Sequence, residues 1–316
     1  MIFLEKILFY VAFLHTDMVL CLERFIHFYK RKELNDLFTI LQKENLNTSV
    51  VRMVINAPLV AAKAQAGQFV ILRVGADGER IPLTVADYDR AAGTVTVIFQ
   101  TVGATTLALS RLKEGDKLCD FVGPLGRPTD TDGLKQVAVI AGGVGCAIAL
   151  PVAKKLFQLG ATVHTICGFR NKDIAILQDE FSAASHRLIT VTDDGSLGEK
   201  GLVTDALRGL LDAGESYDEV IAIGPLPMMK FVSLLTKEYG IKTVVSMNPI
   251  MIDGTGMCGG CRLSVGGEMK FACVDGPEFD GHQVDFDEVM LRSRLYQEQE
   301  RHAYEQSCHL LQKEVL

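Results

Sequence analysis

VAVIAGGVGCAIALP (137–151) is the stretch that decides the fold. It opens with a continuous apolar run typical of a buried strand, and a helical pattern continues through Leu159. The glycine-rich turn between them lets the backbone approach a pyrophosphate, and the helix N-terminus supplies N–H groups. A tight turn with no ligand is the structural alternative, because a lone glycine-rich motif is weak evidence. In this strand–turn–helix context we predict nucleotide binding by Gly142, Gly143, Val144 and Gly145.

Four more apolar runs follow this segment, with helical stretches between them. Buried runs that alternate with helices predict a parallel sheet in a doubly wound α/β domain, which we place at residues 134–246. The runs are TVHTIC (162–167), LITVT (188–192), VIAIG (220–224) and KTVVS (242–246).

The turn IGPLPMM (223–229) comes at the end of the third of these runs. Open α/β sheets bind ligands at the carboxyl ends of their strands, and Gly-Pro makes a sharp turn there. Alone this segment would be an ordinary turn. Paired with the 142–145 loop, it predicts the nicotinamide side of a pocket, formed by Gly224, Pro225 and Met228.

Residues 37–133 show a different pattern, with short runs of β-branched residues punctuated by glycine turns. The runs are VVRMVI (50–55), QFVILRV (68–74) and GTVTVIF (93–99). Short strands at this spacing predict a small antiparallel β-barrel.

Two segments of this barrel predict a second ligand site. RIPLT (80–84) is expected just beyond a strand, and VGATT (102–106) is expected to open a helix. An arginine and a helix N-terminus rich in glycine and threonine suit a diphosphate, and Thr84 offers a hydroxyl or backbone N–H to a flavin ring. The structural alternatives are a turn, a capped helix and, for Arg80, a surface charge. The candidate residues are Arg80, Pro82, Leu83, Thr84, Val102, Gly103, Thr105 and Thr106.

Residues 247–284 form a glycine-rich loop region with three cysteines within sixteen residues. The pattern is Asp253-x4-Cys258-x2-Cys261-x11-Cys273. Plant-type [2Fe–2S] loops use C-x4-C-x2-C and a more distant cysteine, so this is that spacing with its first cysteine replaced by aspartate. We predict a [2Fe–2S] cluster held by Asp253, Cys258, Cys261 and Cys273. Zinc is the alternative metal, although a zinc ribbon would add a second close pair of ligands, and Asp253 before glycine also suits a plain turn.

The composition of the chain excludes several classes of protein. The 316 residues suggest about two domains, and a net charge of −7 argues against nucleic-acid binding. Eight cysteines are too sparse for a disulfide scaffold. We expect Cys119, Cys146 and Cys167, which lie in apolar surroundings, to be small core residues.

The two ends of the chain carry no motif. Residues 1–36 are apolar, but their longest uncharged run is eight residues, too short to span a membrane, and no signal cleavage site follows. An amphipathic peripheral helix and an extension produced by start-site choice are the two interpretations, and we favour the second. Residues 285–316 are charged and predicted to form a helical tail.

The order of these motifs resembles the ferredoxin–NADP⁺ reductase superfamily: a barrel with Arg-x-Pro-x-Thr, a GGVG nucleotide domain with a Gly-Pro-x-Pro-Met turn, and a C-terminal cluster loop. Within it, the chain looks like the branch of the dihydroorotate dehydrogenase B electron-transfer subunit. The small subunits of sulfide dehydrogenase and of NADH-dependent reduced ferredoxin:NADP⁺ oxidoreductase belong to the same branch. DGTGMCGGCR (253–262), with Asp253 in place of a cysteine, points to these last two.

This resemblance implies FAD, NAD(H) and a [2Fe–2S] cluster as cofactors, with NADP(H) as an alternative dinucleotide. A hydride would pass between nicotinamide and FAD, and single electrons would pass through the cluster to a larger glutamate-synthase-like subunit with FAD and [4Fe–4S] clusters. Ferredoxin would take part indirectly. The cluster and the lack of a signal place the protein in the cytoplasm.

The sequence carries signals for both NADPH and NADH. Arg170 and Lys172 suit a 2′-phosphate, whereas Asp193 and Asp194 would repel one; the resemblance favours NADH. Two other functions stay open: the electron-transfer subunit for dihydroorotate oxidation, and a zinc-bearing nucleotide-binding regulatory module without redox activity.

Overall fold

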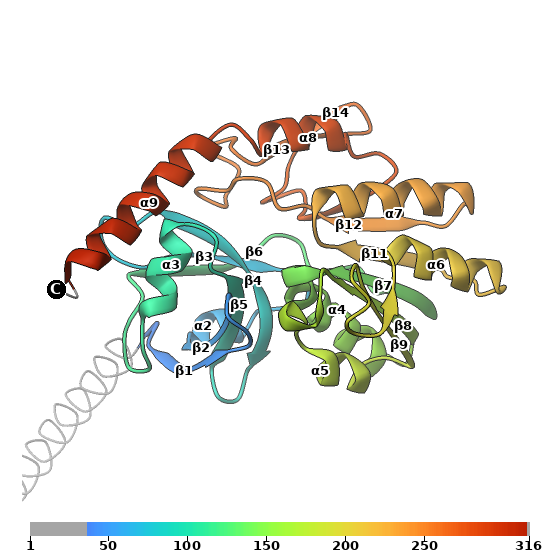
Figure 1. Cartoon of the computed structure of the whole chain (residues 1–316), viewed down its shortest axis with the longest axis horizontal. Helices are drawn as coiled ribbons and strands as arrows, with labels where there is room; N and C mark the ends of the chain where they lie inside the picture. The colour runs from blue at the N-terminus through green and yellow to red at the C-terminus, as the bar shows by residue number, and fades with distance from the viewer. Residues whose placement is uncertain (1–36, 315–316) are drawn as a thin grey trace, which may run out of the picture.

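A computed structural model describes residues 37–314 of the chain, with side chains described through residue 306. The predicted extension, 1–36, lies outside the described residues. Two sheets lie side by side, and the cysteine-bearing segment with its following helices lies across both (Figure 1).

The first sheet is antiparallel and has six strands in the order β1-β2-β5-β4-β3-β6. An isolated antiparallel bridge between Thr39 and Lys117 links its two edges, which confirms the predicted barrel. Alternating apolar residues of these strands fill the interior. The strands are β1 (Ile40–Asn45), β2 (Val50–Asn56), β3 (Phe69–Arg73), β4 (Arg80–Asp89), β5 (Thr94–Gln100) and β6 (Asp120–Leu125), with helices α2 (Pro58–Ala61) and α3 (Ala104–Arg111).

The RIPLT segment differs from its prediction, because it is the first half of β4 rather than a turn beyond a strand. This half pairs with β3, where Pro82 lies opposite Ile71, and pairing with β5 begins only at Val85. Pro82 has no backbone N–H, and proline is tolerated in a strand where one edge is unpaired. One edge of residues 80–84 is therefore free of strand pairing.

The second sheet has seven strands in the order β10-β9-β8-β7-β11-β12-β15. All neighbours are parallel except β12 and β15, so the predicted doubly wound domain is confirmed. The strands are β7 (Gln136–Gly142), β8 (Thr162–Phe169), β9 (Arg187–Thr192), β10 (Glu199–Lys200), β11 (Glu219–Ile223), β12 (Thr243–Ser246) and β15 (Glu278–Asp280). The helices are η1 (Gly143–Gly145), α4 (Cys146–Gln158), η2 (Lys172–Ile174), α5 (Gln178–Ala183), α6 (Val203–Asp212) and α7 (Leu226–Glu238).

The chain reverses its winding direction between β7 and β11, which are neighbours in the sheet but distant in sequence. Ligands of open α/β sheets bind at such a switch point, outside the carboxyl ends of the strands. Both predicted loops, 142–145 and 223–229, leave the sheet there.

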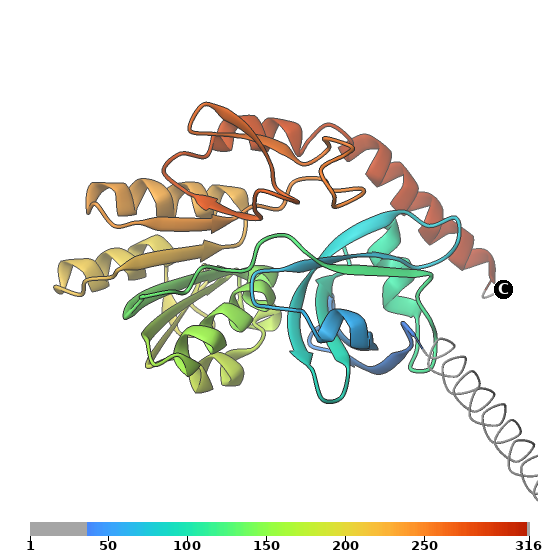
Figure 2. The same ribbon diagram turned by 180° about the vertical axis from the view of Figure 1, so that it is seen from behind.

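The cysteine-bearing segment contains a two-stranded hairpin, β13 (Arg262–Val265) with β14 (Glu268–Phe271). Its last strand, β15, is built into the edge of the dinucleotide sheet. Two helices follow, α8 (Phe286–Arg292) and α9 (Gln297–Glu314), as predicted for the tail. The second runs back over the barrel and lies beside α3 in both views (Figures 1 and 2).

Polar contacts fix the barrel against the dinucleotide domain. Arg52 of β2 pairs with Glu180 of α5 at 2.7 Å, and Lys154 of α4 pairs with Asp87 of β4 at 2.8 Å. Among the described residues, none of the helices combines the length and apolarity needed to cross a bilayer.

Candidate active site

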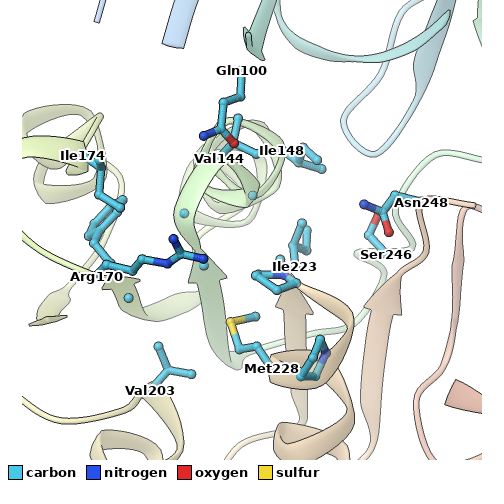
Figure 3. Close-up of a pocket in the computed structure, with 18 of the residues that line it drawn as sticks. Gln100, Val144, Ile148, Arg170, Ile174, Val203, Ile223, Met228, Ser246 and Asn248 are labelled. Carbon is cyan, nitrogen blue, oxygen red and sulfur yellow. The ribbon is translucent and has the colours of Figure 1, made fainter. Parts of the chain in front are cut away.

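A cavity of about 1400 Å³ lies between the two sheets and is open to solvent. Both domains line it, and so do residues that lead into the cysteine-bearing segment. Pockets for one drug-sized ligand are roughly 300–1000 Å³, so this space suits more than one extended ligand. Figure 3 shows Arg170 reaching into the cavity from one side, with Ser246 and Asn248 on the opposite side.

Most of the predicted ligand-binding residues meet at this cavity. They come from β4, the start of α3, and the two loops at the switch point. Those that line it are Pro82, Leu83, Thr84, Val102, Thr106, Gly142, Gly143, Val144, Gly145, Gly224, Pro225 and Met228.

Three predicted residues lie outside the lining. Arg80 is exposed, and its guanidinium lies 3.6 Å from the carboxylate of Asp120. Thr105 donates a hydrogen bond to Glu79 at 3.2 Å. Gly103 donates its N–H to Thr106 Oγ1 at 3.0 Å, so the turn before α3 is held by its own contacts.

Glycine lets the two switch-point loops pack against each other. A Cβ on Gly145 would lie 2.5 Å from the carbonyl oxygen of Ile223, closer than real Cβ atoms approach. Gly143 has φ +55°, a conformation that glycine adopts at little cost. Gly142, Gly143 and Gly145 line the cavity just before α4 and carry no side chain, so an anionic pyrophosphate could approach the backbone at this helix N-terminus.

The far end of the cavity carries charged residues of both signs. Arg170 follows β8, Asp193 follows β9, and Arg208 lies on α6 beside Glu238, with the last pair at 3.5 Å. Neither Lys172 nor Asp194 lines the cavity. The Asp194 carboxylate instead accepts hydrogen bonds from the Ser196 hydroxyl and N–H, which lower its pKa.

Two residues that line the cavity at the end of β12 were not predicted: Ser246, the last residue of the strand, and Asn248, which follows it. Both were detectable in principle, since they lie at the carboxyl end of the last parallel strand, where ligands bind. Phe69 was also missed, because a core strand residue carries no signal that one face meets a cavity.

Of the four predicted cluster ligands, Cys261 and Cys273 lie in contact with each other. The Cys261 thiol donates to the Cys273 sulfur at 3.2 Å, and both residues are buried. Burial, reinforced by the neighbouring Cys261 thiol, raises the pKa of Cys273 to about 12. Cys258 is exposed, and its sulfur accepts the Gly260 N–H at 3.5 Å.

Asp253 holds the turn that leads to Cys258. Its two carboxylate oxygens accept the N–H groups of Thr255 and Cys258, each at 2.7 Å, and these bonds lower the pKa of Asp253. Within residues 37–314, no three His, Cys, Asp or Glu side chains converge closely enough to hold one metal ion.

The loop nevertheless fits an iron–sulfur group by its donors. Cys261 and Cys273 form one pair, Asp253 and Cys258 adjoin through a hydrogen bond, and thiolates are the usual ligands of such clusters. The loop packs on the barrel: a Cβ on Gly254 would lie 2.7 Å from Leu125 Cδ1 and 3.0 Å from Ile71 Cγ1.

The other cysteines divide into two groups. Cys146 and Cys167 are fully buried, as expected for core residues, and burial raises the pKa of Cys146. The expectation for Cys119 was wrong, because its side chain is exposed just before β6. It ends a loop, so its apolar neighbours in sequence do not enclose it.

Comparison with known proteins places these features in a family. Residues 248–285 match the model of the iron–sulfur cluster binding domain of dihydroorotate dehydrogenase B. A Thermotoga maritima homologue of the dihydroorotate dehydrogenase B (NAD⁺) electron-transfer subunit is 47% identical over 266 residues, 84% of this chain and 94% of that one. The electron-transfer subunit of Streptococcus mutans is 33% identical over 263 residues, 80% of this chain and 99% of that one.

A solved structure of NADH-dependent reduced ferredoxin-NADP oxidoreductase aligns with a TM-score of 0.81 and 45% identity. It covers 85% of this chain and 97% of the compared chain. The barrel, the doubly wound sheet and the cluster segment thus define a ferredoxin reductase-like oxidoreductase. The chain belongs to the family of dihydroorotate dehydrogenase B electron-transfer subunits, which are iron–sulfur flavoproteins.

Proposed function

We propose that this chain is an electron-transfer subunit that connects NADH, FAD and a [2Fe–2S] cluster to a larger partner subunit. The cofactors supply hydride and single-electron transfer when bound, and the chain orients them and tunes their potentials. One observation carries the proposal: a single cavity is lined by the predicted flavin residues 82–84, the loop 142–145 and the residues that lead into the cluster segment.

The strand arrangement supports a short route from the cavity to the cluster. Pro82 lies opposite Ile71 in the β3–β4 pair, and Ile71 contacts the loop at Gly254, beside Asp253. One strand therefore separates the predicted flavin segment from the predicted cluster ligands. Met251 and Pro277, both in the cluster segment, also line the cavity.

The lining suggests how the chain would hold each group. The free edge of residues 80–84 would face the flavin ring, and the start of α4 would face the dinucleotide pyrophosphate. Gly224 and Pro225 would leave room for the nicotinamide beside the flavin. No side chain needs to act as an acid or base in the hydride step.

We propose NADH as the preferred dinucleotide, since Asp193 lines the cavity and would repel a 2′-phosphate. The solved relative is also described as NADH-dependent. Arg170 opposes this preference, because it could pair with a 2′-phosphate. Diaphorase rates with NADH and NADPH at matched concentrations test the choice, and a tenfold preference for NADPH would overturn it.

The partner would dock where the cluster loop meets solvent. Cys258 is exposed there, and Met257, Ile252 and Val274 expose 88%, 54% and 40% of their surfaces. We propose a larger glutamate-synthase-like subunit with FAD and [4Fe–4S] clusters, in a cytoplasmic complex that takes electrons from or delivers them to ferredoxin.

A second candidate is the electron-transfer subunit for dihydroorotate oxidation, which the family model and the streptococcal relative favour. Copurification decides between them: a dihydroorotate-oxidising subunit would select the second candidate. Anaerobic purification tests the cofactors, with flavin absorbance, released FAD and a [2Fe–2S] EPR signal after NADH as the expected results. A colourless zinc protein would instead support the regulatory alternative.

A further inference from the structure

Two arginines hold the short peptide that joins Cys258 to Cys261. Arg262 Nη1 donates to the carbonyl oxygen of Gly259 at 3.0 Å, and Arg292 Nη2 donates to the carbonyl oxygen of Gly260 at 3.3 Å. Both carbonyls of the two intervening glycines are therefore turned toward guanidinium groups.

This arrangement fixes where the amide groups point. A trans peptide is planar, so its carbonyl and the following N–H point in opposite directions. With the Gly259 carbonyl turned to Arg262, the Gly260 N–H points the other way, where it donates to Cys258 Sγ at 3.5 Å. The Gly260 carbonyl bond orients the Cys261 N–H in the same manner.

Arg292 reaches this loop from α8, which lies outside the matched cluster segment of residues 248–285. The helix is itself anchored to the hairpin, because Glu288 accepts the Ser264 N–H at 3.0 Å. It is also tied to α7 by the pair of Lys230 and Asp287 at 2.7 Å. These contacts hold the last residue of α8 against the loop.

The two guanidinium groups are not neutralised locally. In the described part of the chain, neither Arg262 nor Arg292 forms an ion pair with a carboxylate, whereas Arg127, which also contacts this segment, lies 3.9 Å from Asp275. A cluster gains one negative charge on reduction, so a nearby fixed positive charge stabilises the reduced form more than the oxidised form.

We propose that Arg262 and Arg292 are positioning residues that raise the reduction potential of the cluster. Their bonds to the glycine carbonyls orient the Gly260 N–H toward the Cys258 sulfur and place two positive charges at the loop, and both hydrogen bonds to sulfur and net charge set such potentials. The inference rests on the [2Fe–2S] cluster of the proposed function and assigns a role in tuning it to a helix outside the cluster segment.

The test is an EPR-monitored redox titration of the holoprotein, with iron content measured for each variant. R262Q and R292Q should each lower the midpoint potential while retaining iron, and R292K should recover most of the loss because it keeps the charge. The matched control is R294Q, which removes an exposed positive charge two residues away. Its potential should stay at the wild-type value.

Wild-type potentials in R262Q and R292Q, at full iron content, would overturn the inference. A shift in R294Q as large as that in R292Q would also overturn it, because the effect would then come from net charge anywhere on the chain and not from charge placed at the loop. Absence of a [2Fe–2S] signal from the wild-type holoprotein would instead refute the proposed function, so the two failures are distinguishable.

Discussion

Thr129, in the link between the two domains, donates a hydrogen bond from Oγ1 to Oε1 of Glu278 at 2.7 Å. Glu278 belongs to β15, so this bond joins the barrel side of the molecule to the cluster segment. Burial raises the pKa of Glu278 to about 7, an effect that the Thr129 hydrogen bond only partly offsets.

This raised pKa predicts a pH-dependent stability. The folded state binds the Glu278 proton more tightly than the unfolded state, so the stabilisation is complete below the unfolded pKa of 4.5 and is lost as pH rises through about 7. We expect a loss on the order of 3 kcal/mol across that window. Denaturant unfolding of wild type and E278Q at several pH values measures it, with the exposed Glu298→Gln as control. Parallel pH profiles for wild type and E278Q would contradict the prediction.

The close approach of the switch-point loops predicts that Gly145→Val impairs dinucleotide binding. Its Cβ would clash with the Ile223 carbonyl and displace the 223–229 turn. We expect NADH binding to weaken by about tenfold or more, roughly 1.4 kcal/mol, with flavin content unchanged. Anaerobic NADH titration provides the measurement. Gly209→Ala is the control, because a Cβ there meets open space and helix propensity improves.

Arg170 and Lys172 should behave differently although both are basic and two residues apart. Arg170 lines the cavity and Lys172 does not. Arg170→Ala should raise the KM for NADH several-fold, about 1 kcal/mol for one charged contact, whereas Lys172→Ala should leave it unchanged. Equal effects of the two substitutions on steady-state KM would show that the cavity is not the dinucleotide site.

Asp253 is predicted to ligate one iron of the cluster as well as to hold its turn. Asp253→Cys should retain the cluster and shift its potential downward, because a thiolate donates more electron density than a carboxylate. Asp253→Ala should make the cluster labile. If Asp253→Ala kept the wild-type iron content, EPR spectrum and potential, Asp253 would not be a ligand. Its role would then be limited to the two backbone hydrogen bonds that hold the turn.

Met257→Glu tests the proposed docking face. The side chain is 88% exposed beside Cys258, so the substitution should not disturb packing. A buried charge at an interface is costly, and we expect association with the partner subunit to weaken by about tenfold or more, while NADH diaphorase activity of the isolated subunit persists. Met269→Glu, 62% exposed on the β13–β14 hairpin, is the comparison. Unchanged copurification of the Met257 variant would place the interface elsewhere.

Local sequence patterns predicted the strands and helices better than they predicted which of these elements pack against each other. The apolar runs at 137–141 and 220–224 carry the buried-strand signal, and the structure confirms them as β7 and β11. The RIPLT segment was expected beyond a strand but lies inside β4. Proline usually breaks a strand, and Pro82 is tolerated here because its half of β4 pairs with β3 alone. Arg292 could not be assigned to the cluster loop from sequence, since its position depends on how α8 packs against a distant segment.

The antiparallel strand β15 bears on whether the cluster segment can be removed from the dinucleotide domain. It occupies the outer edge of β12, whose N–H and C=O groups would otherwise be unpaired. An unpaired edge is a template for association with another chain. A shortened version that ended before the cluster segment would therefore be prone to aggregation, so the iron-binding portion also protects the dinucleotide sheet and cannot be treated as a detachable accessory.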